Sequence, residues 1–593
     1  MSRVLLIGWD SADWGLIHPL LDRGAMPALA ALVNRGVMGR LATLHPPEPL
    51  ALWTSIATGV TADRHGVLGP LTIDADSGRL RPTAGPWNAP PLWEIAAAHH
   101  RRTHVIGWPL AGRPIADEFR VQPADIPASA LLELLPTAAA IDQRYDDRLA
   151  QIAAGLAECC TIHNAATAAL ENEPWDFAAV CYPTIGYFSR RFMQFHPPRL
   201  PRIAERDFEI YHGAVAAIYR FHDALLARLV ELAGPDAAIV LVSAHGFESG
   251  TGRPLPGDLA ARKPRAWFAP YGILCAAGPA LRADELIHGA TLLDIGPTML
   301  ALLNARGAEK MDGRVLADAF RRVPAFAAAP PPSSALAPPA ARGLADHFLA
   351  FEKFDEAPRH PAESEAAATL RFHLACVYLT TGRPGQALPI LETLAGTAPE
   401  DLRFERALAH CYLAVGREQD ADALLSRLLA GSEKLPWMYF LMGVIRMHRG
   451  EADAALELFR QAQSGGNPPA ALHAFIGSVY LAKKMWKDAE PAFQAALDAD
   501  PELADAHIGM SAVRLYQKRN HDAADFALRA AAIRYDHPLA HYQLGLALAR
   551  LRQYARAATA LEAAVKLAPA MTRARRLLSQ VRGRVRSSAS HHG

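Results

Sequence analysis

Val4-Leu5-Leu6-Ile7-Gly8-Trp9-Asp10, near the start of this 593-residue chain, is the stretch that determines the fold of its first half. The unbroken apolar run predicts a strand buried on both faces, and this strand ends in an acid. A second apolar run, Ala238-Ile239-Val240-Leu241-Val242, predicts another buried strand, and Ser243-Ala244-His245-Gly246 follows it. An acid and a histidine at the ends of two buried strands are side chains that can hold a metal ion. Whether this half is an enzyme therefore depends on the residues between Asp10 and His245.

Strand-like and helix-like segments alternate through the first 320 residues or so. Such alternation predicts an α/β domain with a mostly parallel central sheet. The further predicted strands are His104–Gly107, Phe177–Cys181 and Ile273–Ala276, and the predicted helices are Met26–Arg35, Leu92–His99, Arg206–Glu231 and Leu292–Leu303.

The composition of the chain changes near residue 324, where a stretch rich in proline and alanine begins. It includes Pro330-Pro331-Pro332 and Pro338-Pro339, and a segment of this kind favours extended conformations and builds no core. We therefore predict a linker here. The predicted division is an α/β domain at 1–323, the linker at 324–343, a helical lead-in at 344–367, helical repeats at 368–571, and a basic helix with a tail at 572–593.

The region after the linker repeats itself with a period of 34 residues. Each unit has a small residue midway through its first helix, an alanine twelve positions later, and usually a large residue four positions after that. This period is typical of tetratricopeptide (TPR) repeats, so we predict six helix–turn–helix units that stack into an all-α solenoid. The small residues are Ala375, Ala409, Gly443, Gly477, Ser511 and Gly545, and the third positions are Leu391, Leu425, Phe459, Phe493, Ala527 and Leu561.

A basic helix is predicted after Thr572, with arginines that include Arg573, Arg575 and Arg576. We expect it to cap the solenoid, because a terminal repeat needs a polar outer face. Binding of an acidic partner is the alternative. The concave face of the repeats is the predicted binding site for a protein or peptide.

The overall composition excludes several classes of protein. The chain is 51% hydrophobic and 20% charged with a net charge of +1, which does not indicate a nucleic-acid partner. Adjacent Cys159 and Cys160 and the lack of any Cys-x-x-Cys pair fit a reducing compartment. No apolar run approaches the ~18 residues of a membrane span, and the start of the chain lacks the features of a signal peptide. We predict a cytoplasmic protein.

Several motifs before residue 324 occur in the order and spacing of one known family. They are Gly8-Trp9-Asp10-Ser11, Leu52-Trp53-Thr54-Ser55-Ile56-Ala57-Thr58-Gly59, His65-Gly66-Val67, Ser243-Ala244-His245-Gly246-Phe247 and Met311-Asp312-Gly313-Arg314. Through them residues 3–320 resemble the alkaline phosphatase superfamily, in its type I phosphodiesterase/nucleotide pyrophosphatase branch. The resemblance implies an alkaline-phosphatase-like sandwich around the sheet, and the fusion to TPR repeats resembles a bacterial subgroup of the family.

The chemistry of that family implies a Ser or Thr nucleophile and a set of Asp and His ligands around two metal ions, typically zinc. Carried over to this chain, the resemblance retains Asp10 and His245 as metal ligands. The nucleophile position is Pro49, which has no nucleophilic group. None of the other ligand positions carries a zinc-binding side chain, and they are Gly186, Arg190, Ala244 and Phe268.

Arg190 allows two explanations. It could attract an anion, or it could be a solvated arginine at the start of a helix, which we expect.

The residue losses are selective, because scaffold positions such as Met311-Asp312-Gly313 remain while the nucleophile and most metal ligands are missing from several separate loops. We therefore expect a folded pseudoenzyme that needs no cofactor and acts as a scaffold through its TPR repeats. The alternative is an active metal-dependent phosphoric ester hydrolase whose metal site has been rebuilt by other loops. That enzyme would require zinc or another pair of divalent metal ions.

Overall fold

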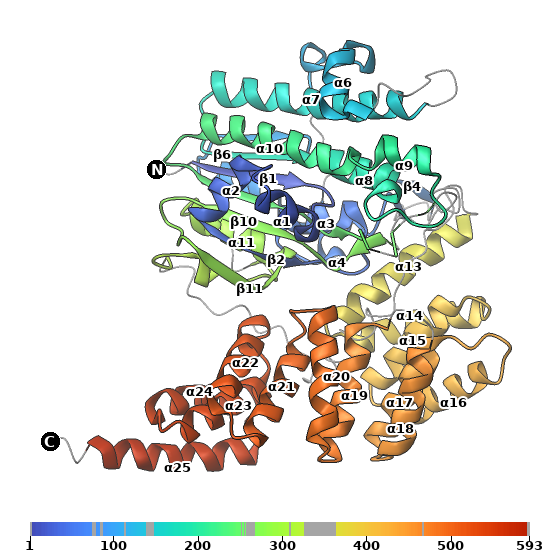
Figure 1. Cartoon of the computed structure of the whole chain (residues 1–593), viewed down its shortest axis with the longest axis vertical. Coiled ribbons are helices and arrows are strands. Elements are labelled where there is room, and N and C mark those ends of the chain that lie inside the picture. The colour runs from blue at the N-terminus through green and yellow to red at the C-terminus, as the bar shows by residue number, and fades with distance from the viewer. Residues whose placement is uncertain are drawn as a thin grey trace. The chain divides into compact units, whose positions relative to one another are not determined.

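The computed structural model describes residues 3–73, 79–83, 87–111, 114–137, 147–250, 252–253, 255, 267–307, 310–324, 363–464 and 468–589. These residues divide into two compact units, an α/β unit and a helical one, and each is described by itself (Figure 1). Apart from Pro324 and residues 363–367, the predicted linker and lead-in lie outside the described residues.

The centre of the α/β unit is a seven-stranded sheet with the strand order β11-β2-β10-β7-β1-β6-β5. Strand β1 (Val4–Trp9) lies between β6 (Phe177–Tyr182) and β7 (Ala238–Val242) and is parallel to both. Strand β5 (Thr103–Ile106) continues the parallel pairing beyond β6. This is the mostly parallel sheet that the sequence predicted.

The other side of the sheet departs from simple parallel order. Strand β10 (Tyr271–Ala277) is antiparallel to both of its neighbours, β7 and β2 (Val37–Ala42). Strand β11 (Glu285–Thr291) is parallel to β2, and its register shifts between Ile287 and Ala290. Sequence analysis did not identify β2 and β11, because polar residues and glycines interrupt their apolar patterns.

Side chains on the two faces of β1 build two separate cores. Leu5, Ile7 and Trp9 lie in one core, whereas Val4 and Leu6 lie in the other, as expected from the alternation of side chains along a strand. The helices of the first core include α1 (Trp14–Asp22), α2 (Pro27–Asn34), α7 (Arg148–Asn172), α8 (Thr184–Phe192) and α10 (Ala214–Ala233). Those of the second are α3 (Pro49–Thr58), α5 (Leu92–Ala98) and α11 (Leu292–Leu302).

The single helix predicted over Arg206–Glu231 is wrong in one respect, because the chain breaks there into α9 (Glu205–Tyr211) and α10. The break falls at His212 and Gly213, and glycine is a poor helix former. The remaining short elements of this unit are α4 (Ala62–His65), α6 (Ala128–Leu134), the ribbon of β3 (Leu71–Ile73) with β4 (Leu80–Pro82), and the ribbon of β8 (Gly246–Phe247) with β9 (Phe268–Ala269).

The second unit is an array of paired helices, in keeping with the predicted solenoid (Figure 1). Each helix packs mainly against its neighbours in the chain. The helices are α14 (Pro384–Thr397), α15 (Leu402–Ala414), α16 (Glu418–Leu429), α17 (Pro436–His448), α18 (Ala452–Gln463), α19 (Ala470–Ala482), α20 (Trp486–Ala499), α21 (Ala504–Tyr516), α22 (Asn520–Ile533), α23 (Pro538–Arg550) and α24 (Tyr554–Leu567).

The small residues of the repeat are in contact with the large residues that the sequence pairs with them. A Cβ atom on Gly443 would lie 2.5 Å from the ring of Phe459, and one on Gly477 would lie 2.8 Å from the ring of Phe493. Both distances are too short for two carbon atoms, so the helices of a unit approach each other this closely only with glycine at these positions. The small and large residues of each 34-residue repeat are therefore the residues through which its two helices pack.

The basic helix α25 (Thr572–Ala589) packs on the end of the array. Its Leu578 and Val581 join a buried cluster with Leu548 and Leu561, while Arg575 and Arg576 are exposed. The helix thus covers apolar side chains of the last repeat and presents arginines on its other side.

Helix α13 (Glu363–Thr380), the first helix of the predicted repeats, belongs largely to the α/β unit, because residues 363–377 are grouped with it. The Nδ1 atom of His373 lies 3.0 Å from the carbonyl oxygen of Leu68. Val377 shares a buried cluster with Ala51 and Ala62. The α/β unit therefore includes side chains from beyond the linker.

Among the described residues, no single helix is long and apolar enough to cross a membrane. The pair α1 and α2 passes the same test of length and composition only when taken together, and the two helices are bent by 100°.

The contact between Gly477 and Phe493 leads to a prediction about stability. Gly477→Ala places a methyl group against the fully buried ring of Phe493. A Cβ atom added to Gly509 would lie only 2.2 Å from the same ring, so the ring has no room to move away. We expect a loss of roughly 1 kcal/mol in the free energy of unfolding, since overpacking outweighs the better helix propensity of alanine.

The matched control is Gly396→Ala in α14, where nothing lies within 4 Å of the added carbon. This variant should be neutral or more stable. Urea unfolding followed by circular dichroism compares the two, and equal effects would contradict the packing explanation.

Candidate functional site at the ends of the central strands

The candidate site lies where β1, β6 and β7 end, around the carboxylate of Asp10. Asp10 follows β1, His245 follows β7, and α8 begins after β6. The carboxyl ends of neighbouring parallel strands meet at one edge of a sheet, which is where α/β proteins usually place their functional residues. Asp10 is only 6% exposed, so its carboxylate depends on protein groups for its interactions.

Four side chains surround the two oxygen atoms of Asp10. The Nε1–H group of Trp53 donates a hydrogen bond to Oδ1 at 3.1 Å, and the Ser11 hydroxyl donates to Oδ2 at 3.4 Å. The Nη1 atom of Arg190 lies 3.9 Å from Oδ2, and Nε2 of His245 lies 3.7 Å from Oδ1. The structure thus brings together three residues that the sequence placed at family ligand positions: Asp10, Arg190 and His245.

Trp53 reaches Asp10 because Gly8 leaves space for its indole ring. A Cβ atom on Gly8 would lie 2.7 Å from that ring. The sequence marked both residues as parts of motifs, but it gave no sign that the indole donates to Asp10. Trp53 is therefore a site residue that sequence reasoning missed.

Position 186 has no room for an acid. A Cβ atom on Gly186 would lie 2.3 Å from Oδ2 of Asp10 and 2.8 Å from the hydroxyl of Ser11. Any side chain here would displace the Asp10 carboxylate. The close packing of α8 against the end of β1 therefore requires glycine at position 186 and leaves no space for an acid there.

Arg190 does not stand at the start of a helix, so that expectation is wrong. It lies in the last turn of α8, one helical turn after Gly186. Residues four apart lie on the same face of a helix, which explains why both meet Asp10. The side chain of Arg190 is only 28% exposed, so it is not a freely solvated arginine.

His245 is fully buried, and its ring stacks on that of Phe268 with 3.8 Å between the ring centroids. Its Nδ1 atom lies 2.9 Å from the carbonyl oxygen of Gly246, which can only accept, so Nδ1 carries the proton and Nε2 presents its lone pair. Burial lowers the pKa of His245, and the negative charge of Asp10 opposes this only in part. The imidazole is therefore neutral.

Ala244 and Ser243 have structural surroundings. Ala244 is fully buried among apolar side chains of the second core. The Ser243 hydroxyl accepts a hydrogen bond from the backbone N–H of Ala12 at 3.0 Å and donates to the carbonyl of His245 at 2.7 Å. It thus ties the ends of β1 and β7 together.

Pro49, at the nucleophile position, is the first residue of α3 and stands one turn before Trp53. The hydroxyls that follow are engaged within their own helix. Thr54 donates to the carbonyl of Leu50 at 2.7 Å, and Thr58 donates to that of Thr54 at 2.8 Å. Neither hydroxyl replaces the missing nucleophile.

Ser55 and His65 form a buried pair that has the wrong proton arrangement for catalysis. Their Oγ and Nε2 atoms are 2.9 Å apart, and the backbone N–H of Val67 donates to Nδ1 of His65 at 3.1 Å. Nε2 therefore carries the proton and donates to the serine, so the imidazole cannot accept the serine proton. Burial also lowers the pKa of His65 to about 3. The pair holds α3 and α4 together.

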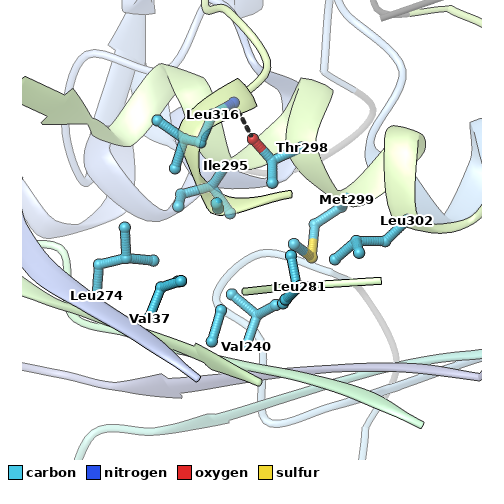
Figure 2. Close-up of a pocket in the computed structure, with 11 residues that line it drawn as sticks. Val37, Val240, Leu274, Leu281, Ile295, Thr298, Met299, Leu302 and Leu316 are labelled. Carbon is cyan, nitrogen blue, oxygen red and sulfur yellow. Dashed lines mark hydrogen bonds between the residues drawn. The ribbon is translucent and has the colours of Figure 1, made fainter. Parts of the chain in front are cut away.

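The pocket in Figure 2 is not a second site. It lies between the sheet and α11 and is lined by aliphatic and methionine side chains such as Val240, Leu274 and Met299. The one hydroxyl, that of Thr298, accepts from the N–H of Leu316 at 3.0 Å and donates to the carbonyl of Asp294 at 2.6 Å. No polar group is left to orient a ligand there.

The donor atoms at Asp10 do not suit a pair of zinc ions. In the part of the chain that the structure describes, no group of three or more His, Cys, Asp or Glu side chains could hold a metal ion. Zinc sites in proteins normally have three or four such ligands, and only Asp10 and His245 remain here. The residues present therefore do not fit the metal pair that the family resemblance implies.

The hydrogen bond from Trp53 leads to a second prediction. Trp53→Phe leaves one oxygen of a buried carboxylate without its donor, and we expect a loss of about 1–3 kcal/mol in the free energy of unfolding. Trp108→Phe is the control, because its Nε1–H group donates at 3.3 Å to the uncharged carbonyl of Trp53. In chemical denaturation, Trp53→Phe should lower the free energy of unfolding more than Trp108→Phe does. The loss caused by Trp53→Phe should be smaller in an Asp10→Ala background. An unchanged cost in that background would contradict the assignment.

Comparison with known proteins gives a separate match for each half of the chain. Residues 4–265 match the family model for type I phosphodiesterase / nucleotide pyrophosphatase. Residues 378–433 and 538–570 match models for the tetratricopeptide repeat.

Individual relatives are distant. Human "Superkiller complex protein 3" is 25% identical over 187 residues, which cover 28% of this chain and only 12% of that protein. The crystal structure of the APC/C hetero-tetramer Cut9-Hcn1 is similar with 17% identity and a TM-score of 0.33, over 36% of this chain and 42% of that chain. The structure of YrrB, a TPR protein with an unusual peptide-binding site, is similar with 18% identity and a TM-score of 0.25, over 31% of this chain and 95% of that chain.

The family models assign the two parts of the chain separately. This chain joins a type I phosphodiesterase/nucleotide pyrophosphatase-like domain to tetratricopeptide repeats.

Proposed function

We propose that this protein is a pseudoenzyme of the phosphodiesterase family that serves as a protein-interaction scaffold through its TPR array. The observation that carries the proposal is the surroundings of Asp10. Its carboxylate is held by Trp53, Ser11 and Arg190, and His245 adds a metal-binding nitrogen at 3.7 Å, but no group of three potential ligands occurs among the described residues. A phosphoester hydrolase of this family needs more ligands than these to hold two metal ions.

The nucleophile position supports the same proposal. Pro49 has no hydroxyl, and the nearby hydroxyls of Thr54, Ser55 and Thr58 are used in hydrogen bonds within the fold. Restoring hydrolysis would therefore require both a nucleophile and metal ligands. Water could serve as the nucleophile, but it would still need the metal ions to lower its pKa and stabilise the developing charge.

The scaffold role is supported by the repeats, which imply binding of a protein or peptide. Their stacked helices form extended surfaces, and we place the partner on the concave face. Cys159 and Cys160 are free thiols, which supports a cytoplasmic location.

A second candidate function is a metal-dependent phosphoric ester hydrolase with a rebuilt site. One observation favours it: the lone pair of His245 Nε2 is buried, has no hydrogen-bond partner, and faces Oδ1 of Asp10 at 3.7 Å. These two atoms could share one divalent ion. Two ligands would hold it weakly, so we rank this candidate second.

Metal content and turnover distinguish the two candidates. We expect the purified full chain to contain substoichiometric zinc and manganese by plasma mass spectrometry, and to hydrolyse an aryl phosphodiester no faster than its Asp10→Ala variant. Stoichiometric metal together with turnover that Asp10→Ala abolishes would establish the enzyme and refute the pseudoenzyme.

The scaffold role has its own test. Partners captured by the full chain and joined to it by photo-crosslinking should attach to helices α14–α24, and Asp10→Ala should capture them equally well. Crosslinks confined to the α/β unit would contradict the assignment of binding to the array.

A further inference from the structure

The space beside Asp10 is occupied by a cation that belongs to the chain itself. Gly186 and Arg190 lie one turn apart on α8, and both approach Oδ2 of Asp10. With no side chain at position 186, the helix comes close enough for the guanidinium of Arg190 to reach to 3.9 Å from that oxygen. An added Cβ on Gly186 would also lie 3.2 Å from Nη1 of Arg190, so the glycine makes room for the arginine as well as for the acid.

We propose that Arg190 is the resident cation of this site, neutralising Asp10 where the family resemblance implies a metal ion and excluding a metal from that carboxylate. The proposal deepens the proposed function and rests on it, since it explains how the domain keeps the acid of a metal site without a metal.

A carboxylate that is removed from water without a counter-charge is strongly destabilising. Trp53 and Ser11 supply hydrogen bonds but no charge. Arg190 is the remaining neighbour in the described site that can balance Asp10, and a guanidinium stays protonated at every accessible pH.

The same guanidinium opposes a metal ion in two ways. Its positive charge repels a divalent cation at a few ångströms, and the low exposure of the site weakens the screening by water. It also has no lone pair, so it cannot become a ligand. Phe268 supplies no ligand atom either, because its ring has only carbon atoms and stacks on that of His245.

A double-mutant cycle tests the first half of the proposal. Asp10→Asn removes the negative charge with almost no change in shape, Arg190→Gln removes the positive charge with a shorter polar side chain, and the double variant removes both. Arg190→Gln alone should lower the folding equilibrium constant about tenfold, and the loss should largely disappear in the Asp10→Asn background. Arg190→Lys should recover part of the loss, since it restores the charge.

Arg191→Gln is the matched control for this cycle. Arg191 is the next residue in α8, but its guanidinium lies over the ring of Tyr187 at 3.6 Å from the centroid. Its effect on stability should therefore be independent of Asp10. Additive effects of Asp10→Asn and Arg190→Gln would overturn the role of Arg190 as a counter-charge.

Zinc uptake by the full chain tests the second half, with equilibrium dialysis against zinc ions as the measurement. Arg190→His removes the cation and adds an imidazole beside Asp10 and His245, so we expect it to bind zinc at least tenfold more tightly than wild type. Arg191→His adds the same residue type one position away and should not. Equal zinc binding by the two variants would overturn the exclusion of metal.

These outcomes separate this inference from the proposed function. Wild-type protein that holds stoichiometric metal and turns over substrate would refute the pseudoenzyme itself. Wild-type protein that is metal-free, with additive effects in the cycle, would refute only the role of Arg190. If Arg190→His fails to fold, the cycle with the milder glutamine variant still decides the first half.

Discussion

The buried negative charge of Asp10 is the constraint on which the site depends. A carboxylate at the end of a central strand loses its hydration when helices pack over it, and other parts of the protein must replace that hydration. Trp53 from α3, Ser11 from the loop after β1 and Arg190 from α8 do so. Two glycines, Gly8 and Gly186, exist at their positions because these partners must come close.

The buried charge of Asp10 also explains how the replacements at the family's metal-ligand positions are related to one another. An acid at position 186 and a cation at position 190 could not both fit beside Asp10 in this arrangement, since the added side chain would strike both groups. Likewise, Phe268 stacks on the ring of His245 with 3.8 Å between the ring centroids, so an apolar contact takes the place of a ligand at this family position. The replacements therefore form a consistent packing arrangement around Asp10. They differ from random damage, which would leave cavities or unpaired charges in the core.

The sequence predicted the buried central strands and the repeats well, because both have strong periodic patterns. The contact of Gly477 with Phe493 agrees with the spacing inside each repeat, in which the large residue follows the small one by sixteen positions. The strands β2 and β11 were not predicted, because polar residues and glycines interrupt their apolar patterns and their places in the sheet depend on pairing with β10 and with each other. At the site, the sequence identified the positions of Asp10, Arg190 and His245, whereas the indole donor of Trp53 and the position of Arg190 in the last turn of α8 depend on tertiary packing.

Helix α13 changes how the chain can be divided. The apolar surface formed by Ala51 and Ala62 is completed by Val377, and the carbonyl of Leu68 is bonded by His373, both from beyond the proline-rich segment. A gene fragment that stops at the change in composition near residue 324 would leave that surface facing water. The compact α/β unit therefore includes residues 363–377 from beyond the proline-rich segment, so the change in composition does not mark its last contributing residue.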